Sequence, residues 1–214
     1  FFVVENPSGS DLFVVSGSTA FPTTGAQLDI PVSGVSDWTR TAVFLSANSD
    51  QANRTYLHQA HVRGALTSNT NLRLQRTGGN SQPEVDYFVV EFRSPLWAVQ
   101  TGEFTLTTGD NAAPQTQAVT SVDVGRSFVT ATWSCGTNGQ EETSVNVQLF
   151  DATTLHFSRN SAPAGTCLVR WTLLSHPNIS VQRGTAVTAT QNDLTATANF
   201  AAVDTSLSFP VTTD

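Results

Sequence analysis

A pattern that occurs three times at a nearly constant interval is the feature that most constrains the fold of this chain. Val-x-x-Gly segments begin at Val14, Val99 and Val181, so successive copies start about 85 residues apart. A second landmark follows each copy about 22 residues later. These second landmarks are Val35-Ser36-Asp37, Val122-Asp123 and Val203-Asp204. Because the two landmarks recur together, they indicate an internal repeat and hence a tandem array of similar modules.

The similarity extends through the rest of each unit. Four positions of the first copy, Leu66, Leu72, Leu74 and Arg76, align with Leu149, Leu155, Phe157 and Arg159 of the second. Each of these two units then closes on an apolar segment, Tyr87–Glu91 in the first copy and Trp171–Ser175 in the second. A segment of the same kind, Phe1-Phe2-Val3-Val4-Glu5, stands at the start of the chain.

The phase of the repeat therefore predicts four segments. Residues 1–11 are an N-terminal strand homologous to the closing strand of a module. Residues 12–94 and 95–177 are module 1 and module 2, and residues 178–214 are an incomplete third module.

Composition predicts β structure in these units. Charged residues make up 13% of the chain and hydrophobic residues 39%, with much of the remainder Ser, Thr, Asn, Gln and Gly. Such a mixture suits a pleated surface better than a helix. Apolar Val145, Val147 and Leu149 alternate with polar Asn146 and Gln148, which is the period of a strand with one buried face. We therefore expect an all-β protein of tandem antiparallel β-sandwich modules, each about 85 residues long.

The junctions between units carry one proline each, followed by a large apolar residue. The prolines are Pro7, Pro95 and Pro177, and the apolar residues are Phe13, Trp97 and Ile179. Short, proline-stiffened junctions with a large side chain favour modules docked end to end, with these six residues at the contact. The alternative for Trp97 is a place in the core of its own module.

The two cysteines, Cys135 and Cys167, both belong to the second unit. They stand beside two predicted strands, so a disulfide between them is expected, and it implies an oxidising compartment. The alternative is two separate thiols in a cytosolic protein.

Several classes of function do not fit this sequence. All ten basic residues are arginine, the arginines are scattered, and the formal net charge is −7, so we expect no nucleic-acid partner. His58 and His61 would point to opposite faces of a strand, so no metal site is expected, and we expect no cofactor. No nucleophile–base arrangement is recognisable, which predicts that the chain has no catalytic residues and is not an enzyme. No apolar stretch is long enough to span a membrane, and the composition favours an extracellular, cell-surface or virion location.

One family resemblance can be stated from packing motifs. Val-Asp is followed by Phe at Phe128 and Phe209, and Leu155–Arg159 is followed by a closing strand that contains Trp171. This pattern is similar to tandem β-sandwich repeats of bacterial surface proteins and of phage tail or fibre proteins. The resemblance implies a structural or adhesive role and transfers no catalytic residue.

The leading functional hypothesis is a structural subunit of an extracellular filament or fibre. In this hypothesis the N-terminal strand of one molecule, Phe1–Glu5, is added to the incomplete third module of its neighbour, which produces a head-to-tail homopolymer. One donated strand would leave that module without its other missing strands, so a second contact or a half-sandwich is also needed.

Two alternatives remain open at this stage. The chain is an excerpt of a longer fibrous repeat protein, or it is an adhesin or phage tail module that binds surface glycans or a receptor. For glycan binding, the residue that stands out is Trp38, which lies beside Asp37 in a predicted turn.

Overall fold

The computed structural model describes residues 11–48, 61–78, 82–107, 114–136, 144–159, 165–184 and 201–203. These residues form twelve strands in four three-stranded antiparallel sheets, together with two single-turn 3₁₀ helices. The predicted all-β class is confirmed. Phe1–Glu5 and Pro7 lie outside the described residues, as does most of 178–214, so the third module stays a prediction.

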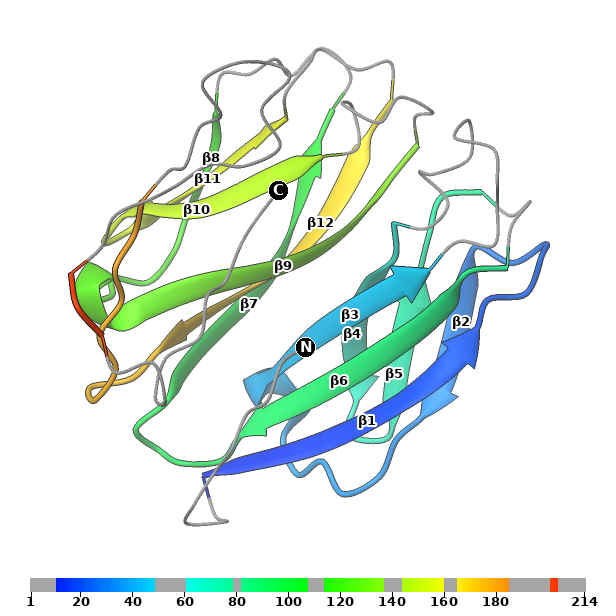
Figure 1. The fold of residues 1–214 in the computed structure, drawn as a ribbon, viewed down its shortest axis with the longest axis horizontal. Coiled ribbons are helices and arrows are strands. Elements are labelled where there is room, and N and C mark those ends of the chain that lie inside the picture. The colour runs from blue at the N-terminus through cyan, green and yellow to red at the C-terminus, as the bar shows by residue number, and fades with distance from the viewer. Residues whose placement is uncertain are drawn as a thin grey trace.

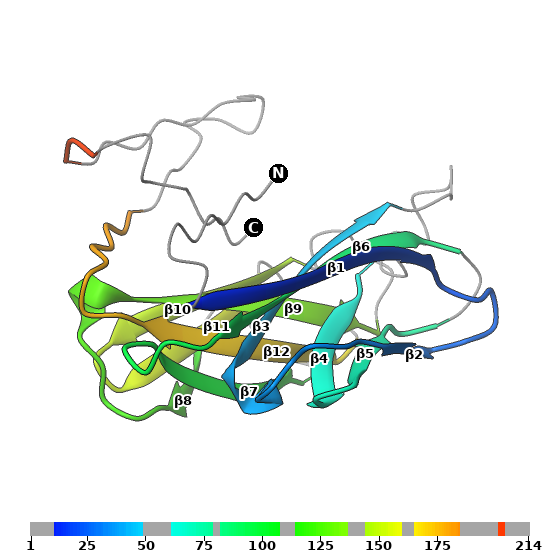
Figure 2. The ribbon, with the colours of Figure 1, turned by 90° about the horizontal axis from the view of Figure 1, so that it is seen from below.

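Module 1 is a sandwich of two sheets (Figure 1). One sheet has the order β1-β6-β3 and the other the order β2-β5-β4. The elements of module 1 are β1 (Leu12–Ala20), β2 (Gln27–Pro31), η1 (Trp38–Arg40), β3 (Thr41–Asn48), β4 (Arg63–Ser68), β5 (Asn71–Gln75) and β6 (Glu84–Phe92). The view in Figure 2 shows β1 and β6 in one layer above β2, β4 and β5.

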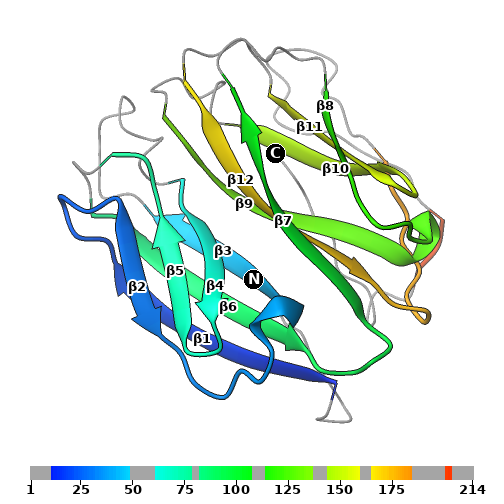
Figure 3. The same ribbon diagram turned by 180° about the vertical axis from the view of Figure 1, so that it is seen from behind.

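Module 2 repeats this arrangement in the same chain order. Its sheets are β7-β12-β9 and β10-β11-β8. Its elements are β7 (Ala98–Leu106), β8 (Gln115–Ala118), η3 (Val124–Arg126), β9 (Ser127–Cys135), β10 (Val145–Asp151), β11 (Thr154–Arg159) and β12 (Cys167–Ser175). Figure 3 shows both modules from the reverse side, with β2, β5 and β4 side by side in front of the first sheet of module 1.

Each module has its own apolar core between its two sheets. In both cores the inward residues alternate with outward ones along the strands, as the period-two pattern predicts. Leu72 and Leu74 on β5 are fully buried, and so are the aligned Leu155 and Phe157 on β11. The aligned residues are therefore packed into the core in the same way in both modules.

A buried arginine occupies one position in both modules. Arg76 donates from Nη2 to the carbonyl of Pro22, and Arg159 donates from Nη2 to the carbonyl of Thr107, at 2.8 and 2.7 Å. The two carbonyls follow the ends of the first strands, β1 and β7, at equivalent places. A buried guanidinium requires such partners because an uncompensated charge in the core is costly. The repeat thus preserves a polar anchor as well as the apolar pattern.

Asp37 and Asp123 cap the two 3₁₀ turns. The Asp37 carboxylate accepts a hydrogen bond from the Thr39 amide, and the Asp123 carboxylate accepts one from the Gly125 amide. In module 1 the buried carboxylate of Glu91 adds a further anchor, because it accepts bonds from the amides of Ser36 and Asp37 at 3.0 and 2.7 Å. Burial raises the pKa of Glu91, but these bonds and those from the Ser36 hydroxyl and Arg93 outweigh it and hold that pKa below its usual value.

Cys135 and Cys167 lie directly opposite each other on β9 and β12 and form a disulfide. Both are fully buried in the core of module 2. The bond ties the end of β9 to the beginning of β12, 32 residues further along the chain.

The last strand of each module lies in the centre of its sheet. β6 pairs with β1 on one side and β3 on the other, and β12 pairs likewise with β7 and β9. The first and third strands therefore do not pair with each other. We call β6 and β12 the closing strands, because each completes a sheet whose other two strands come earlier in the chain.

An aromatic residue on each closing strand lies against the glycine of the Val-x-x-Gly pattern. Tyr87 is opposite Gly17, and Trp171 is opposite Gly102. A Cβ atom on either glycine would lie 2.4 Å from the aromatic side chain, closer than two atoms can approach without moving. Glycine is needed at these positions because the ring occupies the space of the missing side chain.

Substitution of Gly102 by alanine is predicted to destabilise module 2. The new methyl group would push against the Trp171 indole, whose Nε1 donates to Gln117 Oε1 at 3.0 Å and holds the ring in place. We expect a loss of about 1–3 kcal/mol in the free energy of unfolding, measured by urea denaturation. Gly125→Ala is the matched control, since among the described residues a Cβ at Gly125 would meet only Asp123 Oδ1, at an ordinary contact distance of 3.4 Å, and the change there should be below about 0.5 kcal/mol. Equal stabilities of the two variants would contradict this account of the glycine.

Candidate functional site

The outer face of the β7-β12-β9 sheet is turned toward module 1 and changes character along its length. Three cross-strand rows follow one another on this face, each with its β12 residue in the middle. They are an apolar row (Val99, Leu174, Phe128), a threonine row (Thr101, Thr172, Thr130) and a charged row (Glu103, Arg170, Thr132). The charged row is named for Glu103 and Arg170. This junction between the two modules is the candidate functional site.

The apolar row packs against module 1. Leu174 is fully buried in a cluster with Ala42, Val90 and Phe92 of module 1, although it points away from the core of its own module. Trp97, between the modules, packs on this cluster. Its ring centroid lies 4.8 Å from that of Phe92. Burial of apolar side chains from both partners is the main attraction that joins the modules.

Arg40, the last residue of η1, ties the connecting segment to module 1. Its Nε donates to the Phe92 carbonyl at 2.9 Å, and its Nη2 donates to the carbonyls of Ser94 and Trp97 at 2.7 and 3.0 Å. One guanidinium thus holds three carbonyls of the segment that leads from β6 to β7. Its rigid fork of donors suits it to this task.

The residues predicted at the junctions have different surroundings. Trp97 packs between the modules, and its ring centroid also lies 4.6 Å from that of His176. Pro95 is exposed in the tight turn from Ser94 to Trp97, and Pro177 is exposed in the corresponding turn. Ile179 is half-buried at the end of that second turn.

Phe13 was predicted at the junction that precedes module 1. It packs against the core of module 1, and the guanidinium of Arg93 lies 4.2 Å from the centroid of its ring. Phe13 lies on β1, and alternation along that strand turns its side chain inward, toward Gly34. The segment on the other side of this junction lies outside the described residues, so the contact there stays a prediction.

The threonine row lies deeper in the junction, beside a small cavity of about 20 Å³. Next to it, the amide of Gly64 on β4 donates to Thr132 Oγ1 of module 2 at 3.1 Å. A Cβ on Gly64 would lie 3.0 Å from side-chain atoms of both Leu74 and Val43, so these side chains pack closely against the glycine.

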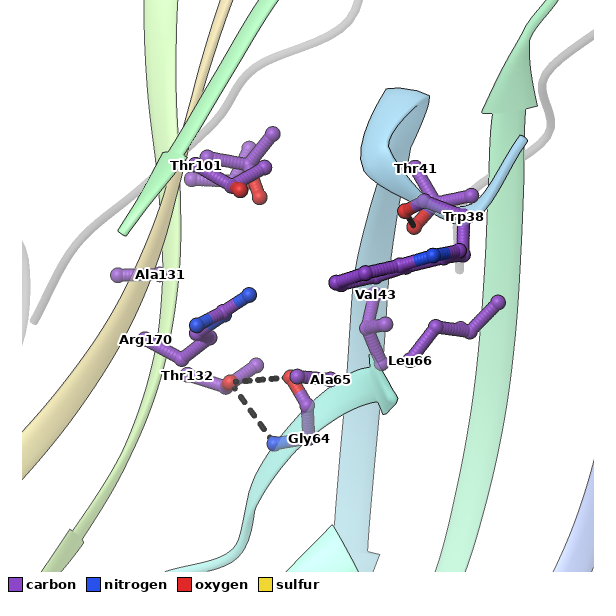
Figure 4. A pocket seen from close by; sticks show the side chains of 12 residues that line it. Trp38, Thr41, Val43, Gly64, Ala65, Leu66, Thr101, Ala131, Thr132 and Arg170 are labelled. Carbon is purple, nitrogen blue, oxygen red and sulfur yellow. Dashed lines mark hydrogen bonds between the residues drawn. The ribbon is translucent and has the colours of Figure 1, made fainter. Parts of the chain in front are cut away.

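A larger cleft of about 330 Å³ opens beyond the threonine row. Trp38, Arg63 and Arg73 line it from module 1, and Glu103 and Arg170 line it from module 2. Figure 4 shows the Trp38 indole extending into the space between the modules, with Arg170 across from it. Asn69 holds the Trp38 segment, because its side chain accepts from the Trp38 amide at 2.9 Å and donates to the Ser36 carbonyl at 2.8 Å.

Positive charges outnumber negative charges in and around the cleft. Glu103 Oε1 lies 3.3 Å from Arg63 and 3.6 Å from Arg170, so one carboxylate serves two guanidinium groups. Burial lowers the pKa of Arg63, and among the described residues its buried Nε has no hydrogen-bond partner. Arg73 is neutralised by Asp29, whose pKa falls to about 2 through this hydrogen-bonded pair. One positive charge is therefore left over in the cleft.

Sequence reasoning identified Trp38 and Trp97 but missed the other residues of the junction. Arg40, Arg63, Glu103 and Arg170 carry no local motif, and they come together only because two modules pack. For Arg40 the repeat itself offered one indication. Arg40 ends the turn that Asp37 begins, as Arg126 ends the turn that Asp123 begins.

Two further searches cover the part of the chain that the structure describes. Within it, no group of three or more His, Cys, Asp or Glu side chains is placed to hold a metal ion. In the same residues, no helix is both long and apolar enough to cross a membrane.

Removal of the Arg40 donors is predicted to loosen the junction. Arg40→Met keeps much of the side-chain volume but leaves three carbonyls without this partner, so we expect a loss of about 1–3 kcal/mol in the free energy of unfolding. The control Arg126→Met changes the equivalent turn of module 2, where the side chain is half exposed and pairs with Asp123 at 3.4 Å. That variant should lose less than about 1 kcal/mol. Urea denaturation measures both, and an Arg40→Met protein as stable as the control would contradict the proposed clamp.

Comparison with known proteins does not assign this chain to a family. No family model matches it, and neither a curated protein nor a solved structure matches it. The role of the junction must therefore be argued from its own residues and contacts.

Proposed function

We propose that this chain is a structural subunit of an extracellular filament or fibre, in which the closing strand Phe1–Glu5 of one copy is added to the third unit of the next. The observation that carries the proposal is Gly184. In the described residues, no atom lies within 4 Å of a Cβ placed on Gly184, whereas aromatic side chains cover the equivalent Gly17 and Gly102.

The position of the closing strand explains why Gly17 and Gly102 are covered and what would cover Gly184. In modules 1 and 2 the first strand carries the Val-x-x-Gly pattern and pairs with the closing strand of the same module. Val181–Gly184 carries this pattern again. A closing strand with an aromatic residue opposite Gly184 would complete the arrangement, and β-strand addition is an established way for one chain to supply a strand to another.

Phe1–Glu5 has the sequence that such a strand requires. It differs from Tyr87–Glu91 only at the first residue, where Phe1 replaces Tyr87. In the register of β6 with β1, Phe1 would lie opposite Gly184 and Val4 opposite Val181. Glu5 matches Glu91, the buried carboxylate that accepts backbone hydrogen bonds in module 1.

A pair of hydrogen bonds supports a third unit that begins like module 2. Gln100 donates to the Thr120 carbonyl and accepts from the Thr120 amide, at 2.9 and 2.8 Å. Gln182 makes the same two bonds with Ala201, at 3.1 and 2.7 Å. Thr120 and Ala201 each stand three residues before the repeated aspartate, Asp123 or Asp204. The segment after Val181 is thus held as the equivalent segment of module 2 is held.

The second junction also resembles the first. The Trp97 amide donates to the Ser94 carbonyl at 3.2 Å, and the Ile179 amide donates to the His176 carbonyl at 3.3 Å. The Val181 amide then donates to the Gly125 carbonyl at 2.8 Å, and Arg183 donates to the carbonyls of Val124 and Ser127. These bonds fasten the segment that follows β12 to module 2, which favours a stiff element over a flexible tether.

An extracellular setting agrees with the chemistry of the chain. The disulfide between Cys135 and Cys167 is of a kind that persists in oxidising compartments. Head-to-tail strand addition is a heterologous contact, so it extends into an open polymer when its geometry does not close into a ring.

Register-specific cross-linking tests the proposal. In a Val4→Cys, Val181→Cys double variant the two thiols are predicted to face each other between copies, so mild oxidation should yield a ladder of covalent oligomers on a non-reducing gel. In the control, Val3→Cys with Val181→Cys, a shift of one residue places the thiols on opposite faces of the sheet, and oligomers should be far fewer. No oligomers, equal ladders from both variants, or a cross-link confined to the monomer would overturn the proposal.

A further inference from the structure

We propose that the cleft between modules 1 and 2 binds a saccharide that carries a carboxylate group. This site shares no residue with the proposed strand contact, so either proposal can fail without the other. It follows from three features of the cleft: an exposed aromatic surface, an excess of guanidinium charge and a suitable size.

The aromatic surface is Trp38. Its residue surface is 38% exposed, although most large apolar residues of the described chain are buried or half-buried. The backbone around it is held on both sides, because its amide donates to Asn69 Oδ1 and its carbonyl accepts from the Thr41 hydroxyl at 2.7 Å. An indole on a backbone held in this way offers a large contact area to the C–H face of a sugar ring, and the backbone loses little conformational entropy on binding.

The excess positive charge of the cleft favours an anionic ligand. Arg63 and Arg170 share the single carboxylate of Glu103, which is 58% exposed and so remains largely hydrated. The Arg63 side chain is only 13% exposed, and among the described residues its Nε lacks an acceptor. A ligand carboxylate would accept from these guanidinium groups and supply the missing negative charge. The cleft is thus an exception in a chain whose net charge is −7.

The size and the rest of the lining favour a short saccharide. A volume of about 330 Å³ lies at the lower end of the range for small-molecule sites. Besides Trp38 and the charged groups, the lining includes Thr67 and Gln75, whose side chains donate to or accept from hydroxyl groups. The many hydroxyls of a sugar match such a lining better than an apolar ligand does.

The test uses trigalacturonate as the acidic probe and maltotriose as its neutral counterpart. Isothermal titration calorimetry of the full chain at low ionic strength should detect trigalacturonate binding with a dissociation constant of about 1 mM or tighter. Maltotriose should bind at least about tenfold more weakly, because it lacks the carboxylates that the arginines recognise.

Three variants locate the binding site. Trp38→Ala and Arg170→Gln should each weaken trigalacturonate binding by about tenfold or more, through loss of stacking and of a charged donor. Phe150→Ala is the matched control, since Phe150 is an exposed aromatic (60%) that stacks on His156 of module 2 and does not line the cleft. Unchanged thermal unfolding of all three variants ensures that a loss of binding is not a loss of fold.

Three results would overturn the proposal. They are no trigalacturonate binding up to about 5 mM, equally tight binding of the two probes, and binding that survives both cleft substitutions.

Discussion

The closing strand is the constraint on which the rest of this structure depends, since it lies between two strands that do not pair with each other. β6 joins β1 to β3, and β12 joins β7 to β9, so each of these sheets exists only when the last strand of the module is in place. The aromatic side chain of that strand fills the space over a glycine of the first strand, as Trp171 does over Gly102. The pair of Trp171 and Gly102 therefore lies where the closing strand pairs with the first strand, and the size of the ring fits the space that the glycine leaves. A first strand with this glycine is complementary to any closing strand that brings an aromatic ring, whether from its own chain or from another. That complementarity links the fold to the proposed assembly.

The junction between the modules shows how one sheet face serves two purposes. Its apolar row contributes most of the attraction, because a fully buried aliphatic side chain such as Leu174 is worth about 1.5–3 kcal/mol. The ion pairs of Glu103 contribute little in comparison, since partly exposed pairs are typically worth about 0–1 kcal/mol. The modules thus hold together through the apolar cluster and the Arg40 clamp. Arg63 and Arg170 are not needed for that purpose, which agrees with the proposed role of these two arginines in ligand binding. The proposed fibre and the proposed binding cleft are compatible for this reason.

Much of the fold was predictable from the sequence, because repeated positions carry the same physical requirement in each copy. The alignment of Leu72 with Leu155 and of Arg76 with Arg159 predicted equivalent places, and the structure has both pairs buried. Alternation along the strands predicted the β class. The junction was harder, because its contacts join residues that are far apart in the chain and depend on how one module lies against the other. Phe13, predicted at the junction that precedes module 1, packs against the core of module 1, and the segment on the other side of that junction lies outside the described residues. The charged cleft had no local signal, since Arg63 and Glu103 meet only across two modules.

Electron microscopy of negatively stained protein tests the central claim most directly. The intact chain would be imaged beside a version that lacks Phe1–Glu5, at the same concentration and ionic strength. The account predicts filaments from the intact chain and dispersed particles from the shortened one, because the shortened chain has no closing strand to offer its neighbour. Dispersed particles in both samples, or filaments in both, would contradict assembly through this strand.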